Sequence, residues 1–183
     1  DVTLNGNTQM TIELKNDAGD TTIHTMKFQN VSHLVGTANN DTITGDSRDN
    51  VLDGAAGDDT IFGFSGTNTL LGGAGNDQIT GGSGVDIING GSGNDTIFSS
   101  AGNDSLDGGI GQNTLSFAQR DGVGVFVDLN ISTASIDTNG GVNYNEEDRV
   151  SKIQEIIGNN SDNTLYGNSS PRVRQAKKQL RLP

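Results

Sequence analysis

The chain has 183 residues and no cysteine, so it is long enough for one domain or two small ones and holds no disulfide. Hydrophobic residues make up 31% of it and aromatic residues 4%, too few for an ordinary globular core, while the 27 glycines indicate either disorder or a repeat. The net charge is −12, and residues 1–168 carry −17 because six basic residues face 23 acidic ones there. So acidic a segment repels nucleic acid and anionic membranes and attracts cations. No apolar run reaches the roughly 18 residues of a membrane span.

Residues 1–35 form the first segment, and we expect strands there that cap the segment after them. Apolar and polar residues alternate in residues 11–15 (TIELK), a pattern typical of a half-buried strand. A cap is expected because the end of a stack of strands exposes backbone edges and apolar side chains.

Residues 36–116 consist of nine nonapeptides with no insertion or deletion. The first position is glycine in eight of the nine, the sixth is aspartate in six and asparagine in three, and the eighth is isoleucine or leucine in all. Glycines at fixed positions permit turn conformations that a Cβ forbids, and one apolar residue between two outward ones has the period of a short strand. The eighth-position residues, predicted to point inward, are Ile43, Leu52, Ile61, Leu70, Ile79, Ile88, Ile97, Leu106 and Leu115.

These nonapeptides resemble the RTX, or hemolysin-type, calcium-binding repeat, whose pattern is GGxGxDxUx with U an apolar residue. The resemblance covers 36–116 without a break and resumes at 158–167. It implies an all-β fold, a right-handed parallel β-roll in which two nonapeptides, 18 residues, form one coil. Odd-numbered nonapeptides would form one parallel sheet of short strands and even-numbered ones the other, with turns of six residues between them.

The resemblance also implies calcium ions between turns on the same edge of the roll. Ca²⁺ takes six to eight oxygen ligands; each ion would be held by the sixth-position side chains of two turns, the first and third carbonyls of one turn, and the second and fourth carbonyls of the next. Two carboxylates are present in the pairs Asp41/Asp59, Asp59/Asp77, Asp77/Asp95 and Asp86/Asp104. One carboxylate is present in the pairs Asp95/Asn113 and Asn68/Asp86. Four good sites and up to two weaker ones are therefore expected.

The carbonyl ligands implied by the resemblance come from positions one to four of these turns. They are Gly36, Ala38, Ala55, Gly57, Gly54, Ala56, Gly73, Gly75, Gly72, Ala74, Gly91, Gly93, Gly90, Ser92, Gly109, Gly111, Gly81, Ser83, Ser100, Gly102, Gly63, Ser65, Gly82 and Gly84.

One pair of turns departs from this pattern. Asn50 and Asn68 supply no carboxylate, and Arg48 replaces the fourth-position glycine, so we expect no ion between them. The alternative explanation for all sixth-position residues is turn formation alone, because Asp and Asn favour turns. Turn formation would explain an isolated Asn-Asp pair well, but it explains less well why six aspartates occupy the same position of the nonapeptide.

Residues 117–157 look like a second copy of the first flank, and 158–168 like the start of a second roll. The sequence VSHLVGTANNDTITG at 31–45 matches IQEIIGNNSDNTLYG at 153–167. Residues 169–183 carry five basic residues and no acidic one. We interpret this tail as a fragment boundary or an artificially appended segment; a native basic tail that contacts a polyanion is the alternative.

The sequence shows no recognisable arrangement of catalytic residues. His24 and His33 occur without an HExxH motif, no serine lies in a G-x-S-x-G elbow, and there is no cysteine nucleophile. We therefore expect no enzymatic activity. Phe62 and Phe98 occupy the outward ninth position, and we expect them to contact a flank or a neighbour rather than a sugar.

The leading hypothesis is a structural calcium-binding module that folds in extracellular calcium. The resemblance implies secretion by a type I system and neighbouring domains in a longer bacterial toxin, adhesin or enzyme. A calcium-dependent module that binds a carbohydrate or a cell surface is the alternative. Ice binding by the row of Thr42, Thr60, Thr96 and Thr114 is a third, which Gln78, Phe62 and Phe98 interrupt.

Overall fold

The computed structural model describes residues 24–27, 32–120, 124–128, 133–137, 146–159, 161, 163–166 and 172–174. Residues 11–15, predicted to form a strand, and most of the basic tail lie outside these ranges. Every regular element within them is a β-strand. No helix in the described ranges meets the length and hydropathy needed to cross a membrane.

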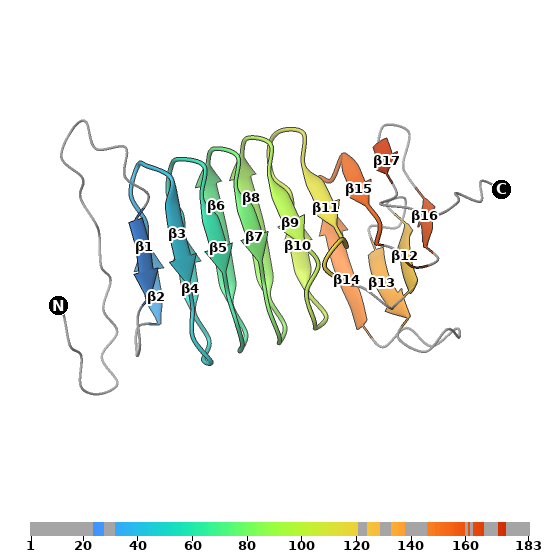
Figure 1. Ribbon diagram of the computed structural model, residues 1–183, viewed down its shortest axis with the longest axis horizontal. Helices are drawn as coiled ribbons and strands as arrows, with labels where there is room; N and C mark the ends of the chain where they lie inside the picture. The colour runs from blue at the N-terminus through green and yellow to red at the C-terminus, as the bar shows by residue number, and fades with distance from the viewer. Residues whose placement is uncertain are drawn as a thin grey trace.

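The strands form two sheets that face each other along a rod, with the strands crossing its long axis (Figure 1). One sheet has the spatial order β1 (His24–Lys27), β3 (Asp41–Thr44), β5 (Thr60–Phe62), β7 (Gln78–Thr80), β9 (Thr96–Phe98), β11 (Thr114–Ser116), β15 (Glu155–Ile157) and β17 (Arg172–Arg174). The other has the order β16 (Thr164–Tyr166), β12 (Gly124–Asp128), β13 (Thr133–Asp137), β14 (Glu146–Ser151), β10 (Ser105–Asp107), β8 (Ile87–Ser92), β6 (Thr69–Ala74), β4 (Val51–Asp53) and β2 (His33–Val35).

The pairing confirms the predicted all-β parallel solenoid. Strands from odd-numbered nonapeptides lie in one sheet and those from even-numbered ones in the other. Neighbouring strands pair in parallel, and residues 18 apart face each other, as Ile61 does Ile79 and Leu70 does Ile88. Two nonapeptides therefore form one coil.

The interior is the stack of eighth-position side chains predicted from the sequence. All nine are buried, with at most 3% of their surface exposed. Leu34 extends this core on one side and Phe117, Val150 and Ile156 extend it on the other. Each nonapeptide thus contributes one inward apolar side chain, and the core is continuous along the rod.

The turns bring successive coils into close backbone contact, which explains the fixed glycines. Gly75 and Gly93 have φ angles of 137° and 131°, in the left-handed region that side chains disfavour. A Cβ on Gly75 would also overlap the carbonyl of Gly57 in the preceding coil. Two turns of the nonapeptides nevertheless place a larger residue at a positive φ, Ala55 at 73° and Phe64 at 77°.

The parallel stack continues beyond Ser116, where the nonapeptides end. β14 pairs with β10, and β15 pairs with β11, in the register of the preceding coils. Within the nonapeptides, five residues separate the ninth position of one repeat from the sixth position of the next. After Ser116, residues 117–147 stand in place of these five on one edge, and they include the antiparallel pair β12 and β13. On the other edge, residues 152–154 replace a six-residue turn. Part of the segment expected to be a flank therefore forms a coil of the roll.

Candidate metal centre

The sixth-position side chains form one buried row along each edge of the roll. We call Asp41, Asp59, Asp77, Asp95 and Asn113 the first ladder. We call Asn50, Asn68, Asp86 and Asp104 the second ladder. Each of these side chains is at most 2% exposed. All six aspartates predicted as calcium ligands thus lie in the two ladders, each close to its partner 18 residues away.

Within a ladder, each backbone N–H donates a hydrogen bond to the side chain of the next member. The N–H of Asp59 donates to Asp77 Oδ1 at 2.8 Å, and the N–H of Asp86 donates to Asp104 Oδ1 at 2.9 Å. The other steps span 2.7–3.0 Å. Asn68 and Asn113 accept in the same way as the aspartates, so these bonds require an oxygen at the sixth position but no charge.

One carboxylate oxygen of most ladder aspartates is buried without a hydrogen-bond partner. These atoms are Asp41 Oδ1, Asp59 Oδ2, Asp77 Oδ2, Asp86 Oδ2 and Asp95 Oδ2. Burying a carboxylate is costly unless the charge is paired or bound to a metal. A cation bound beside these rows of carboxylate oxygens would therefore lower the cost of burying them.

Burial also disfavours the ionised form of these groups. It raises the pKa of Asp59 to about 7, and the neighbouring carboxylates Asp77 and Asp41 add to the rise. It raises the pKa of Asp77 to about 6, with a further contribution from Asp95. The pKa values of Asp86 and Asp95 are raised by burial as well. A divalent cation beside them would favour ionisation, because an opposite charge stabilises the carboxylate.

The first-position glycines leave open the space on which ladder oxygens and carbonyls converge. A Cβ on Gly36 would lie 2.6 Å from the carbonyl oxygen of Gly54 and 2.8 Å from Asp41 Oδ2. A Cβ on Gly72 would overlap Asp77 Oδ2 and the carbonyl of Gly90 in the same way. Carboxylate and backbone carbonyl oxygens in combination are the donor set that Ca²⁺ prefers. The residues present therefore fit the ion that the resemblance implies.

Several carbonyls predicted as ligands already accept hydrogen bonds between coils. The N–H of Ala74 donates to the carbonyl of Ala55 at 2.9 Å, and the N–H of Gly57 donates to the carbonyl of Ala74 at 2.8 Å. A carbonyl oxygen has two lone pairs, so it can accept one bond and still face an ion. Coordination by these carbonyls stays a prediction, as does the number of ions.

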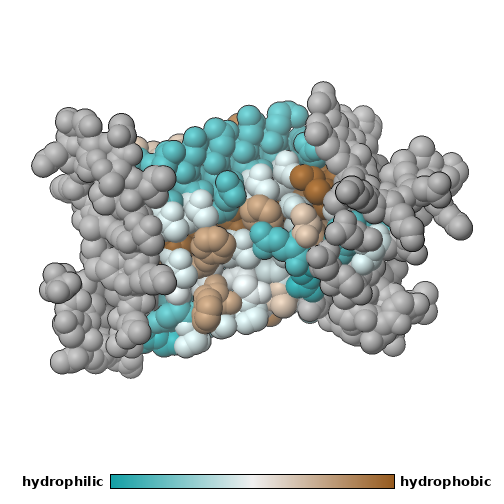
Figure 2. All heavy atoms as spheres, viewed as in Figure 1, coloured by the Kyte–Doolittle hydropathy of each residue, from teal (hydrophilic) through white to brown (hydrophobic). Residues whose placement is uncertain are grey.

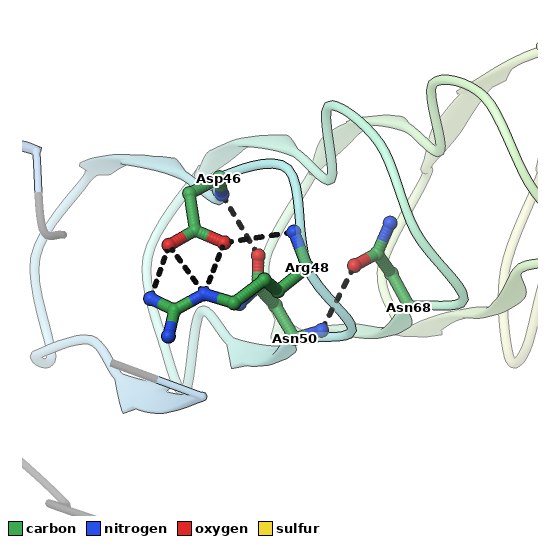
Figure 3. A network of polar contacts seen from close by, with 4 residues as sticks. All are labelled: Asp46, Arg48, Asn50 and Asn68. Atoms are coloured by element: carbon green, nitrogen blue, oxygen red, sulfur yellow. Dashed lines mark hydrogen bonds and ion pairs between the residues drawn. The ribbon is translucent and has the colours of Figure 1, made fainter. Parts of the chain in front are cut away.

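The turn at 45–50 has a different chemistry, shown in Figure 3. Asn50 Oδ1 accepts from the N–H of Asp46 at 2.8 Å, and the N–H of Asn50 donates to Asn68 Oδ1 at 3.0 Å. The exposed guanidinium of Arg48 forms an ion pair with Asp46 at 2.7 Å. Amides fill the ladder here and a side-chain cation pairs with the nearby carboxylate; that no ion binds between Asn50 and Asn68 stays a prediction.

Two further residues continue the ladders, and sequence reasoning missed both. The N–H of Asp104 donates to Asp148 Oδ1 at 2.9 Å, and the N–H of Asn113 donates to Gln154 Oε1 at 2.7 Å. Both residues stand two places before an inward apolar residue, Val150 and Ile156, as the sixth position does. That local signal is weak, because Asp148 follows Asp104 by 44 residues and Gln154 follows Asn113 by 41, and neither spacing equals the repeat period of 18.

A family model described as RTX calcium-binding nonapeptide repeat matches the sequence in four copies, at residues 35–63, 62–97, 80–115 and 155–170. These matches cover 35–115 and 155–170, which is 81 plus 16, or 97, of the 183 residues. No curated protein matches the sequence. The stacked parallel coils, the buried carboxylate ladders and this match agree: the chain belongs to the RTX calcium-binding nonapeptide repeat family.

Proposed function

We propose that this chain is a structural module of a secreted bacterial protein, that it folds on binding extracellular calcium, and that it has no catalytic activity. The observation that carries the proposal is the pair of ladders, in which buried carboxylates hold oxygens without hydrogen-bond partners. RTX repeats are typical of secreted bacterial proteins, which supports the extracellular setting.

In this proposal, particular ladder residues have a role in calcium binding. Asp59 and Asp77 lie between two acidic neighbours each, so each would serve two ions. Asp86 and Asp104 form the acidic pair of the second ladder. Bound calcium would neutralise carboxylates that otherwise repel one another across adjacent coils, and it would join those coils through shared ligands.

The small apolar interior supports a contribution of calcium to folding. One inward side chain per nonapeptide is a small hydrophobic gain against the conformational entropy of nine ordered residues. Calcium modules outside cells bind with dissociation constants of roughly 10⁻⁴–10⁻³ M. A chain of this affinity would stay unfolded at the low calcium level inside a bacterial cell and would fold after export.

A calcium titration followed by circular dichroism and calorimetry tests the proposal. We expect a disordered chain in chelator, a cooperative gain of β signal as calcium rises into the millimolar range, and binding of at least four ions. Magnesium at the same concentration should not replace calcium, because it prefers a smaller, strictly octahedral shell and keeps its water. A full β signal in chelator, or no heat of calcium binding, would show that the proposal is wrong.

Exposed aromatic side chains favour one second candidate, a calcium-dependent module that binds a carbohydrate or a cell surface. Phe62 and Phe64 are 40% and 61% exposed. Figure 2 shows hydrophobic residues gathered on the viewed face, below a hydrophilic band along its upper edge. Aromatic rings exposed in this way can stack on a flat ligand. Binding to a glycan array in calcium that Phe62→Ala and Phe64→Ala abolish would support this candidate, and no binding would exclude the glycans tested.

A further inference from the structure

We propose that Asp104 and Asp148 form an additional calcium site, which fastens the return of the long connection at 117–147 to the roll. This inference rests on the proposed calcium binding of the ladders. It goes beyond it, because Asp148 lies outside the nonapeptides and outside every region that the family model matches.

The backbone places Asp148 in the second ladder. β14 pairs with β10 in parallel, with Leu106 opposite Val150, as β10 pairs with β8, with Leu106 opposite Ile88. The N–H of Asp104 donates to Asp148 Oδ1 at 2.9 Å, the same bond and the same distance as from Asp86 to Asp104. Asp148 therefore stands where the next sixth-position residue of the roll would stand.

Both carboxylates are withdrawn from solvent. Asp104 is 2% exposed and Asp148 is 1% exposed. The equivalent step of the first ladder joins two amides, those of Asn113 and Gln154. At this coil, therefore, only the second ladder brings two acidic side chains together among the described residues. Asp148 Oδ1 accepts from the backbone N–H of Asp104, so the two buried carboxylates lie on adjacent turns, where a cation between them would offset their mutual repulsion.

A neighbouring serine supplies an independent observation. Ser99 is the one residue other than glycine at the first position of the nine nonapeptides. Its hydroxyl is buried, with 4% of the residue exposed, and has no hydrogen-bond partner. At the equivalent Gly81 and Gly90, a Cβ would point at Oδ2 of the aspartate five residues later. In Ser99 this direction leads toward the carboxylate of Asp104.

The donors at this site are all oxygen atoms. Ser99 adds a hydroxyl to the two carboxylates, and Ser100 Oγ, 3.0 Å from Asp104 Oδ2, orients that carboxylate. Oxygen donors with two negative charges select a hard divalent cation, and the ladder geometry favours Ca²⁺. An ion here would join β10 to β14 and extend the calcium-dependent unit to the coil that follows the insertion.

The test uses the whole chain and the variant Asp148→Asn, with calcium counted by calorimetry and by native mass spectrometry. Asparagine keeps the Oδ1 acceptor, as Asn68 shows at the same ladder position, so the fold is retained and one charge is lost. Asp49→Asn is the matched control, because Asp49 is an exposed turn residue whose Oδ1 accepts from the N–H of Thr67 at 2.7 Å. Asp148→Asn leaves one carboxylate at this site, as in the weaker pairs, so at calcium concentrations that fill only the pairs with two carboxylates we expect it to bind one ion fewer than the parent chain and than Asp49→Asn.

A second variant, Ser99→Gly, restores the residue found at this position in the other eight nonapeptides. It should weaken binding at this one site by roughly tenfold, the loss typical when a supporting ligand is removed. If Asp148→Asn binds as many ions as the control while Asp77→Asn binds fewer, the additional site is wrong and the proposed function stands. If the parent chain binds no calcium, the proposed function itself fails. If Asp148→Asn does not fold in calcium, an unchanged affinity in Ser99→Gly overturns the inference.

Discussion

Replacing Asp77 by asparagine separates the two contributions of a ladder aspartate. The carboxylate accepts the N–H of Asp59 through Oδ1, and asparagine would keep that bond, as Asn113 does for Asp95. What is lost is one negative charge shared by two pairs, Asp59/Asp77 and Asp77/Asp95. The substitution therefore removes a proposed calcium ligand without opening a cavity or leaving an N–H unpaired.

The size of the effect follows from linkage between binding and folding. A site with a dissociation constant of about 0.1 mM stabilises the folded chain by about 2.7 kcal/mol in about 10 mM calcium. Loss of both sites around Asp77 would then lower the free energy of unfolding by up to about 5 kcal/mol. Urea unfolding in calcium, followed by circular dichroism, measures this difference.

The effect of Asp77→Asn on stability should change sign when calcium is removed. Burial raises the pKa of Asp77 to about 6, so at pH 7.5 its ionised carboxylate destabilises the metal-free fold. In chelator, Asp77→Asn should thus be at least as structured as the parent chain. The control is Asp49→Asn, which removes an exposed charge with the same hydrogen-bonding role. The reasoning would be refuted if the two variants lost equal stability in calcium. It would also be refuted if Asp77→Asn lost as much stability in chelator as in calcium.

The ladders and the turns give four further predictions. Burial raises the pKa values of Asp59 and Asp77 to about 7 and about 6, so the metal-free fold is favoured at low pH and loses stability as pH rises through these values. Circular dichroism in chelator should therefore show more β signal at pH 5 than at pH 8. For the same reason, calcium affinity measured by calorimetry should fall from pH 8 to pH 5.5. Phe64→Gly should raise the urea midpoint in calcium, by about 1 kcal/mol in stability, because Phe64 has a φ of 77°. Gly72→Ala should lower stability in calcium by about 2 kcal/mol or more, since its Cβ would overlap Asp77 Oδ2; an unchanged midpoint in either variant would contradict the turn geometry.

The sequence predicted the roll because its period is strict. Nine nonapeptides in one register define which residue points inward, and the burial of Ile43 through Leu115 agrees at every eighth position. The same register placed six aspartates in two rows, and the rows are present. A solenoid permits this inference because each coil contacts only its neighbours, so local repetition determines the global arrangement.

The sequence did not predict the coil after the nonapeptides. Asp148 and Gln154 reach the ladders through an insertion on one edge and a shortened turn on the other, and neither keeps the period. Their positions are fixed by the pairing of β14 with β10 and of β15 with β11. Strand pairing depends on the whole edge presented by the preceding coil, which a search for repeats does not take into account.

Hydrogen exchange of the ladder amides in calcium and in chelator tests the central claim most directly. The N–H of Asp77, bonded to Asp95 Oδ1 at 3.0 Å, lies in the middle of the first ladder and reports on two coils at once. If calcium supplies the free energy that orders these coils, this amide and those of β5 to β9 will be strongly protected in calcium and will exchange as fast as an unfolded chain in chelator. Equal protection in both conditions would contradict the account.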